Sequence, residues 1–466
     1  MFRHLANIYS VPDLRKKIFY TLMLIAVHRI GAHIPVPLVD PVVVKEKIGG
    51  MVSGGGVFGM IDMFSGGAFS QMTVFALGIM PYISASIILQ LLMIVWPRLE
   101  KIAKEGEIGK KKINQYTRYG TVGLALAQSC GIGIWLAQGG MTLIPGHSAL
   151  FVMLAALSIT TGTCFIMWLG EKITEHGIGN GISIMITLGI LARYPTSILR
   201  SLVRVKDGNM TMFFFICVLA LFLLMTVIIV VFQTATRKIP IQHARRQVGR
   251  RMTQAQTQFL PLKINTAGVI PVIFSSAILQ FFPLILTPFT GGQASTGFLG
   301  WLGNLFNMQS TVNPYDLMKI DESFLEQAFI FDALKSINMY VIIYIVLTAF
   351  FCYFYTAITF NPIDLAENLK KSGAFVPGRR PGKATSDYIE FVMVRITFVG
   401  AFYLCAVSVL PMVMVISYGM DYSLMDFVGG TGLIIVVSVL LDTLKQVESQ
   451  LMVRHYEGFR IRRRGA

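Results

Sequence analysis

The stretch MFFFICVLALFLLMTVIIVVF, residues 212–232, contains no charged side chain. About 20 apolar residues in a helix are enough to cross the hydrocarbon core of a bilayer, so this stretch predicts a transmembrane helix. The whole chain has the same character, because 54% of its 466 residues are hydrophobic and only 14% are charged. Soluble domains carry roughly 25% charged residues. The composition therefore favours an integral membrane protein over a soluble multidomain enzyme.

Working outward from residues 212–232 gives ten apolar segments. They lie near 18–35, 72–96, 116–137, 149–170, 181–199, 212–234, 266–288, 335–359, 391–415 and 425–444. The run from Tyr119 to Gly170 lacks Asp, Glu, Lys and Arg and is too long for one span, but the glycines and proline of 139–146 divide it. We therefore expect an all-α integral membrane protein with ten transmembrane helices.

The positive charge of the chain is concentrated in alternate loops. The net charge is +16, and of the 40 Lys and Arg residues 29 fall on the side of both termini and seven on the other side. Cytoplasmic loops carry an excess of Lys and Arg, so both termini are predicted to be cytoplasmic. Twelve of the 29 lie in the loops 235–265 and 360–390. Such loops act as topology signals or contact anionic lipid, and a ribosomal RNA or acidic protein surface is an equally good partner.

The sequence contains no recognisable catalytic or metal-binding motif. The five cysteines lie in separate apolar segments without CxxC spacing, which argues against a disulfide framework or a zinc site. There is no GxxxxGKS/T, HExxH or GxSxG motif, and no pair of acidic residues lies in the middle of an apolar segment; Asp426 and Asp442 lie near the two ends of the last one. We therefore expect neither enzymatic activity nor a cofactor. A secondary transporter for a small solute and a structural membrane scaffold remain alternatives.

Two glycine-rich segments stand out. Residues 49–67 hold eight glycines in 19 positions, which predicts either a mobile outer segment or a loose exterior loop. The segment Gly177–Gly181, GIGNG, follows a turn and not a strand, so it is not a dinucleotide-binding fingerprint. It predicts a tight connection into the fifth span, with Asn180 as a candidate helix cap.

Isoleucine recurs at helical spacing in two of the spans. Ile79 and Ile83 are four residues apart around Pro81, and Ile182 and Ile186 repeat this spacing. Residues four apart lie on one face of a helix. Lipid-facing isoleucines are common, but a hydrophobic constriction also closes pores by dewetting, so both interpretations stay open.

Five longer motifs make the chain recognisable. They are FALGIMPYISASIILQLL (75–92), QYTRYG (115–120), MWLGEKITEHGIGNG (167–181), LPLKINTAGVIP (260–271) and NLKKSGAFVPGRRPG (368–382). These motifs closely resemble the SecY family of bacterial protein-conducting channels, and the resemblance extends from the first span to the tenth.

The resemblance implies a fold and a function. Two pseudo-symmetric five-helix halves, residues 1–205 and 206–466, would form a clamshell around an hourglass pore. The chain would be the central subunit of the Sec translocon in the bacterial plasma membrane. It would act as a passive channel that moves unfolded polypeptides across the membrane and releases membrane-protein helices laterally into the bilayer.

The resemblance also implies roles for individual residues. An apolar ring at the waist of the pore would consist of Ile79, Ile83, Ile182, Ile186, Ile273 and Ile435. A plug within about 58–70 would include Phe58, Met60, Ile61, Asp62, Met63, Phe64, Ser65, Gly66 and Gly67. A lateral gate between spans 2 and 3 and spans 7 and 8 would involve Gln90, Gln128 and Asn265. The docking arginines for the ribosome or the SecA motor would be Arg250, Arg251, Arg379 and Arg380.

The partners that the resemblance implies are all macromolecules or lipids. They are SecE-like and SecG-like small membrane subunits, the SecA motor ATPase, the ribosome with its RNA, signal sequences, nascent polypeptides and anionic lipids. Three segments look individual to this chain: the glycine run 49–56, the outer segment 289–334 and the basic tail Arg460–Arg464. They leave the limits of the plug and the role of the tail open.

Overall fold

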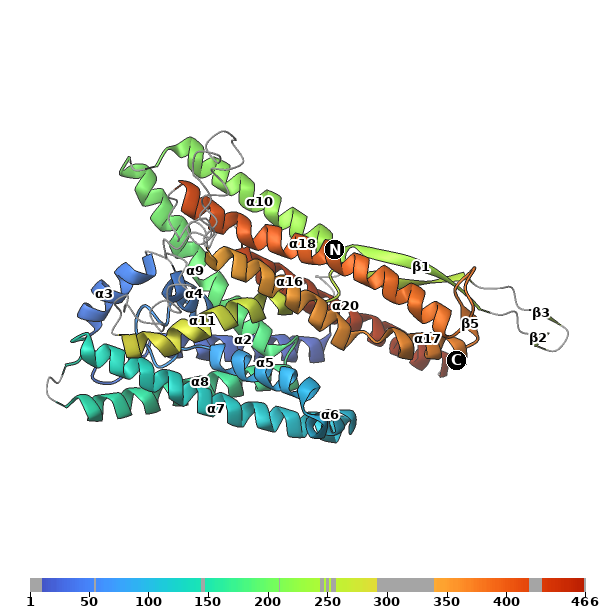
Figure 1. Ribbon diagram of the computed structural model, residues 1–466, viewed down its shortest axis with the longest axis horizontal. Helices are drawn as coiled ribbons and strands as arrows, with labels where there is room; N and C mark the ends of the chain where they lie inside the picture. The colour runs from blue at the N-terminus through green and yellow to red at the C-terminus, as the bar shows by residue number, and fades with distance from the viewer. Residues whose placement is uncertain are drawn as a thin grey trace, which may run out of the picture.

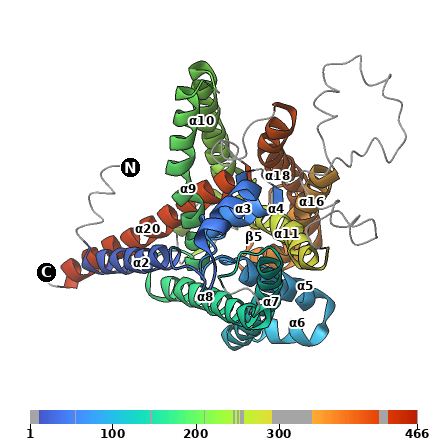
Figure 2. The same cartoon turned by 90° about the vertical axis from the view of Figure 1, so that its left-hand side faces the viewer.

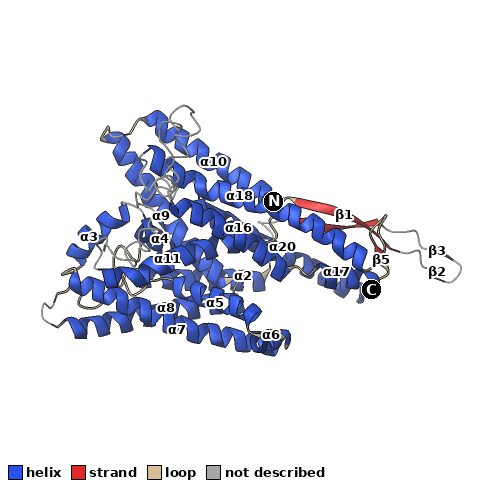
Figure 3. Cartoon of the chain, in the orientation of Figure 1, coloured by secondary structure: helices blue, strands red, loops and turns tan. Residues whose placement is uncertain are grey.

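The computed structural model describes residues 11–53, 56–143, 147–208, 210–243, 247–248, 251–252, 257–290, 339–418 and 430–464. Long helices make up the body of the molecule, and the strands gather at one end of it (Figure 1, Figure 3). Seen from the opposite end, a short helix, α4, lies among the longer ones (Figure 2).

The described elements follow the order of the predicted spans. The first part of the chain forms helices α2 (Pro12–Gly31), α3 (Pro41–Ser53), α4 (Gly56–Ser65), α5 (Met80–Val95), α6 (Pro97–Lys104), α7 (Glu107–Gln138), α8 (Ser148–His176) and α9 (Gly181–Lys206). The second part forms helices α10 (Met212–Thr234), α11 (Ile270–Thr290), α16 (Met339–Thr359), α17 (Pro362–Lys371), α18 (Lys383–Tyr418) and α20 (Gly430–Arg464). The strands are β1 (Thr236–His243), β2 (Gln247–Val248), β3 (Arg251–Met252), β4 (Thr257–Lys263) and β5 (Ala374–Phe375).

A helix lies at each of the ten predicted spans. Seven of the described helices are long and apolar enough to cross a membrane, and the bent pair α5 and α6 brings the number to eight. The mostly helical, multi-pass membrane class is therefore confirmed, while the count of ten stays a prediction. The strands were not predicted, because they lie in polar loops between the apolar segments.

The second span ends at a sharp bend. Helices α5 and α6 meet at an angle of 103°. Pro97 is the first residue of α6, and the preceding Trp96 is extended, with φ −108° and ψ 105°. A residue before proline is pushed out of the helical region by the proline ring. The sequence Trp96–Pro97 therefore ends the membrane helix and starts a new direction.

The structure differs from the sequence-based predictions in two segments. The segment predicted to span from residue 72 becomes helical only at Met80, because the backbone before it turns with positive φ at Met72 and Gly78. The glycine-rich segment is also not a loose loop in its described residues. Helix α3 runs through Gly49 and Gly50, and its Ile48 is fully buried.

The two basic loops are joined by one small sheet. Strands β1 and β4 pair antiparallel from Thr236 opposite Lys263 to Gln242 opposite Thr257. Strand β5, from the other loop, pairs with the end of β1, so the strand order is β4-β1-β5. A hydrophobic cluster supports this sheet; its buried members are Ile239, Leu262, Val376, Ile389 and Met393. Two loops that are far apart in sequence therefore form a single structured end of the molecule.

Candidate functional site

The predicted ring residues come together from four helices. Ile79 and Ile83 lie at the start of α5, Ile182 and Ile186 at the start of α9, Ile273 in α11 and Ile435 in α20. Five of them are buried in one hydrophobic cluster, and the sixth, Ile182, is partly buried against it. The structure thus brings all six side chains into one apolar region, while their role as a pore ring stays a prediction.

Local sequence explains why α9 presents its isoleucines there. The side-chain oxygen of Asn180 accepts hydrogen bonds from the backbone N–H of Ile182 (3.1 Å) and Ser183 (3.4 Å). This confirms the predicted cap, which satisfies donors that a helix start leaves unpaired. A Cβ on Gly181 would collide with the carbonyl oxygen of Gly170 in α8. Glycine at this position therefore lets the first turn of α9 lie directly against α8.

The predicted plug residues lie on helix α4 and in the turn that follows it. Residues 59–65 are buried, and the apolar side chains among them reach three different hydrophobic clusters. Met63 and Phe64 join the isoleucine cluster, and Ile61 joins a cluster built from α3, α7 and α8. Met60 packs beside Tyr340 of α16, whose hydroxyl donates to the Met60 Sδ at 3.1 Å. Helix α4 therefore packs between helices of the first part of the chain and helices of the second part (Figure 2).

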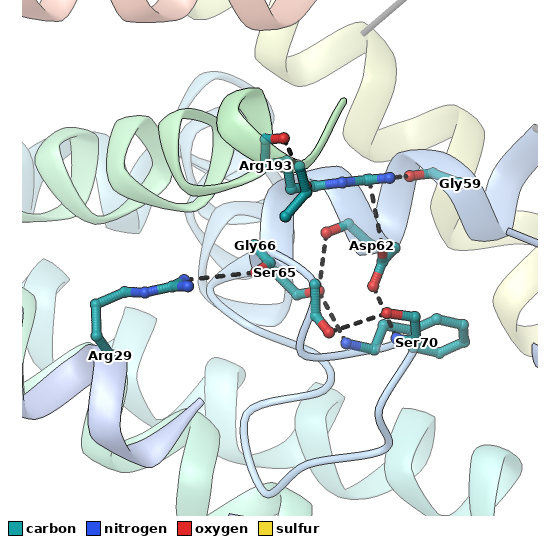
Figure 4. Close-up of polar contacts among 10 residues, drawn as sticks. Arg29, Gly59, Asp62, Ser65, Gly66, Ser70 and Arg193 are labelled. Atoms are coloured by element: carbon teal, nitrogen blue, oxygen red, sulfur yellow. Dashed lines mark hydrogen bonds and ion pairs between the residues drawn. The ribbon is translucent and has the colours of Figure 1, made fainter. Parts of the chain in front are cut away.

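Polar contacts fix the same helix (Figure 4). The Asp62 carboxylate pairs with Arg193 of α9 at 3.3 Å and accepts a hydrogen bond from the Ser70 backbone N–H at 2.7 Å. Arg193 also donates to the carbonyl oxygen of Gly59 at 3.3 Å. From α2, Arg29 donates to the carbonyl oxygen of Gly66 at 3.4 Å.

The sequence did not predict the contacts of Arg193 or of Arg29. The Arg29 guanidinium reaches the end of the predicted plug segment. The only available signal was a basic residue, Arg193, within an apolar stretch together with Asp62 in the glycine-rich segment. No local sequence pattern indicates that Asp62 and Arg193 are in contact.

The predicted gate residues do not lie together. Gln128 of α7 lines a cavity of about 10 Å³ together with Ser84 of α5 and Gln280 of α11. The side-chain oxygen of Gln128 and both polar side-chain atoms of Gln280 lack a hydrogen-bond partner within the described part of the chain. Gln280 was not predicted. It became visible only because α5, α7 and α11 pack against one another.

The other two predicted gate residues lie elsewhere. Gln90 is partly buried on α5 and donates to the Ser86 hydroxyl at 3.2 Å. Asn265 precedes α11 and donates to the Gly268 carbonyl oxygen at 3.0 Å. It lines a separate cavity of about 190 Å³ that also includes Asp442.

The predicted docking arginines are only partly described. Arg379 and Arg380 are exposed in the turn after β5. The Arg379 guanidinium lies 5.2 Å from the centre of the Tyr388 ring, which orients it through a cation–π contact. Arg251 belongs to strand β3, and Arg250 lies outside the described residues.

Comparison with known proteins identifies this arrangement. The model of the SecY family matches residues 73–444. The chain belongs to the SecY family. The protein translocase subunit SecY of Escherichia coli K12 is 42% identical over 452 residues, which cover 96% of this chain and 94% of that protein.

Two solved structures show the same fold. One is a SecY whose plug domain is described as stabilising the closed state of the translocation channel. It aligns with a TM-score of 0.61 at 18% identity, over 93% of this chain and 91% of that one. The other is Sec61 in the canine ribosome–channel complex, with a TM-score of 0.58 at 16% identity and the same coverages. The predicted family and fold are therefore confirmed.

Proposed function

We propose that this chain is the central, channel-forming subunit of a Sec translocon, a passive conduit for unfolded polypeptides and not an enzyme. The observation that carries this proposal is the packing of α4 against the isoleucine cluster. A narrow apolar ring excludes ions by dewetting when it is empty. Branched side chains also close around an extended chain of any composition, so such a ring suits transport of many different polypeptides.

The two halves of the proposed clamshell are residues 1–205 and 206–466. Within the first, α7 contacts α8 and α8 contacts α9; within the second, α11, α16, α18 and α20 contact one another in sequence order. The isoleucines come from both halves, because α5 and α9 precede α10 while α11 and α20 follow it. Parting of the halves would therefore widen the ring.

The lateral gate would open where α11 packs against α5 and α7. Buried polar groups without hydrogen bonds are costly, and this seam holds such groups on Gln128 and Gln280. Opening the seam would let water or a passing backbone satisfy them. A hydrophobic signal sequence or nascent membrane helix would then leave through the seam into lipid. Gln90 and Asn265 are proposed to lie beside this route.

The structured end formed by β4, β1 and β5 would be the cytoplasmic docking surface. It lies at one end of the helical body (Figure 1) and carries the exposed Arg379 and Arg380. Positive side chains suit ribosomal RNA, acidic surfaces of the SecA motor and anionic lipid headgroups. Arg250 and Arg251 are proposed to add to it. The 29 to seven distribution of Lys and Arg supports a bacterial plasma membrane protein with both termini in the cytoplasm.

Reconstitution tests this function against its chief rival. Proteoliposomes that contain this chain, a SecE-like and a SecG-like subunit, SecA and ATP are expected to protect an unfolded secretory precursor from added protease. Liposomes without the chain are the control. A saturable flux of a small solute with no protection of the precursor would favour the transporter instead, and inert liposomes would favour the scaffold.

A further inference from the structure

Helix α4 contains one charged side chain, Asp62, and this side chain is buried. The Asp62 side chain is 3% exposed, and its ion-pair partner Arg193 is 10% exposed. An unpaired charge in such surroundings is strongly unfavourable, whereas a pair with added hydrogen bonds is tolerated. Each of these two residues is therefore held in place by the other.

Arg193 contacts the backbone of α4 as well as the Asp62 side chain. Its guanidinium bonds both the Asp62 carboxylate and the Gly59 carbonyl oxygen, so it spans one turn of α4 (Figure 4). The Asp62 carboxylate in turn accepts from the Ser70 backbone N–H at 2.7 Å, beyond the end of the helix. Through these contacts the pair connects α9 to the beginning and the middle of the plug segment and to the residues that follow α4.

A close backbone contact lies one helical turn before Arg193. A Cβ on Gly189 would lie 2.7 Å from the carbonyl oxygen of Phe64, and a Cβ on Gly66 would lie 2.9 Å from the Cα of Gly189. Gly66 has φ +70°, a conformation that side chains rarely adopt. Gly189 and Arg193 are four residues apart and share a face of α9. This face therefore forms a fitted seat for the plug, with the ion pair at one end.

We propose that Arg193 is a positioning residue that latches the plug through Asp62 and sets how often the idle channel opens. The inference rests on the function proposed above. The helix that carries the latch also carries Ile182 and Ile186, so displacement of α9 would disturb the ring and the latch together. Once water reaches the pair, both charges are hydrated and their attraction falls several-fold. The ion pair therefore holds the plug strongly while water is excluded and weakly once water reaches it. This difference favours two distinct states of the channel.

The test measures how often the plug leaves its seat. Ser65 is buried in α4, and a Ser65→Cys reporter would react with a membrane-impermeant maleimide only after the plug moves. The reporter is placed in an otherwise complete chain, with its partner subunits, in which the natural cysteines are replaced by alanine: Cys130, Cys164, Cys217, Cys352 and Cys405.

Arg193→Gln and Asp62→Asn should each raise the labelling rate roughly tenfold or more, since each removes one charge of the buried pair and keeps the other. The double variant should label no faster than the faster single variant, because neither charge is then left over. Arg200→Gln, an exposed arginine on the same helix, should leave the rate unchanged. If the single effects multiply in the double variant, or if no variant differs from the parent, the latch is refuted. Should Arg193→Gln not accumulate in the membrane, Asp62→Asn and the double variant still decide.

A plug deletion separates this inference from the proposed function. Removal of residues 58–67 should raise ion conductance through the idle channel in planar bilayers. If it does not, the sealing function itself fails. If the deletion leaks while the Arg193 and Asp62 variants label like the parent, only the latch fails.

Discussion

Asn180 decides where α9 begins, and with it where Ile182 and Ile186 lie. Its side chain replaces two hydrogen bonds that the first helical turn cannot make internally. The GIGNG sequence predicted this cap, because a residue of this type before an apolar helix is a local signal. Partners such as Asp62 and Arg193, or Gln128 and Gln280, could not be predicted. They meet only through packing of helices that are far apart in sequence.

Replacement of the cap should weaken the start of α9. Asn180→Ala is expected to cost about 1 kcal/mol of stability, the usual value for a lost cap. Asn180→Asp keeps an acceptor at the same position and should cost much less. Thermal unfolding of the purified proteins in one detergent provides the comparison. Equal midpoints for the parent and Asn180→Ala would show that the cap contributes nothing.

At the scale of elements, the apolar helices were predictable and the loop strands were not. An uninterrupted apolar run such as α10 can be recognised as a transmembrane helix from its length and composition alone. The pairing of β5 with β1 needs a contact between residues 375 and 242, which no local pattern encodes. Helix α3 was missed for the opposite reason: its glycines predict a loop, but buried Val44 and Ile48 hold the helix in place.

The exposed position of Arg380 beside this sheet leads to a prediction about docking. Arg380→Glu should abolish most SecA-driven import of a precursor into proteoliposomes, since a negative charge would repel an acidic partner surface. The measurement is the protease-protected fraction of precursor. Arg200→Glu, an exposed arginine in the last two turns of α9, makes the same charge change outside the sheet and should import normally. Full import by Arg380→Glu would remove the docking role.

At the scale of the whole molecule, the charge distribution and the apolar core have separate tasks. The predicted spans put most of the basic residues on one side, where they would orient the chain and offer a surface to partners. Charged side chains are rare among the buried residues that the structure describes, and helix α4 packs against the isoleucine cluster. Within those described ranges, the buried Asp62–Arg193 ion pair is the exception, and it lies where α4 meets α9.

This arrangement would seal the idle channel against ions, and single-channel conductance measures that seal. Single idle channels are recorded in planar bilayers for the parent and for Ile83→Ser combined with Ile186→Ser. The matched control combines Ile88→Ser and Leu199→Ser, which alter exposed residues of the same two helices. We expect a steady ion leak through the ring variant and none through the parent or the control. A ring variant as tight as the parent, or a control that leaks equally, would contradict the account.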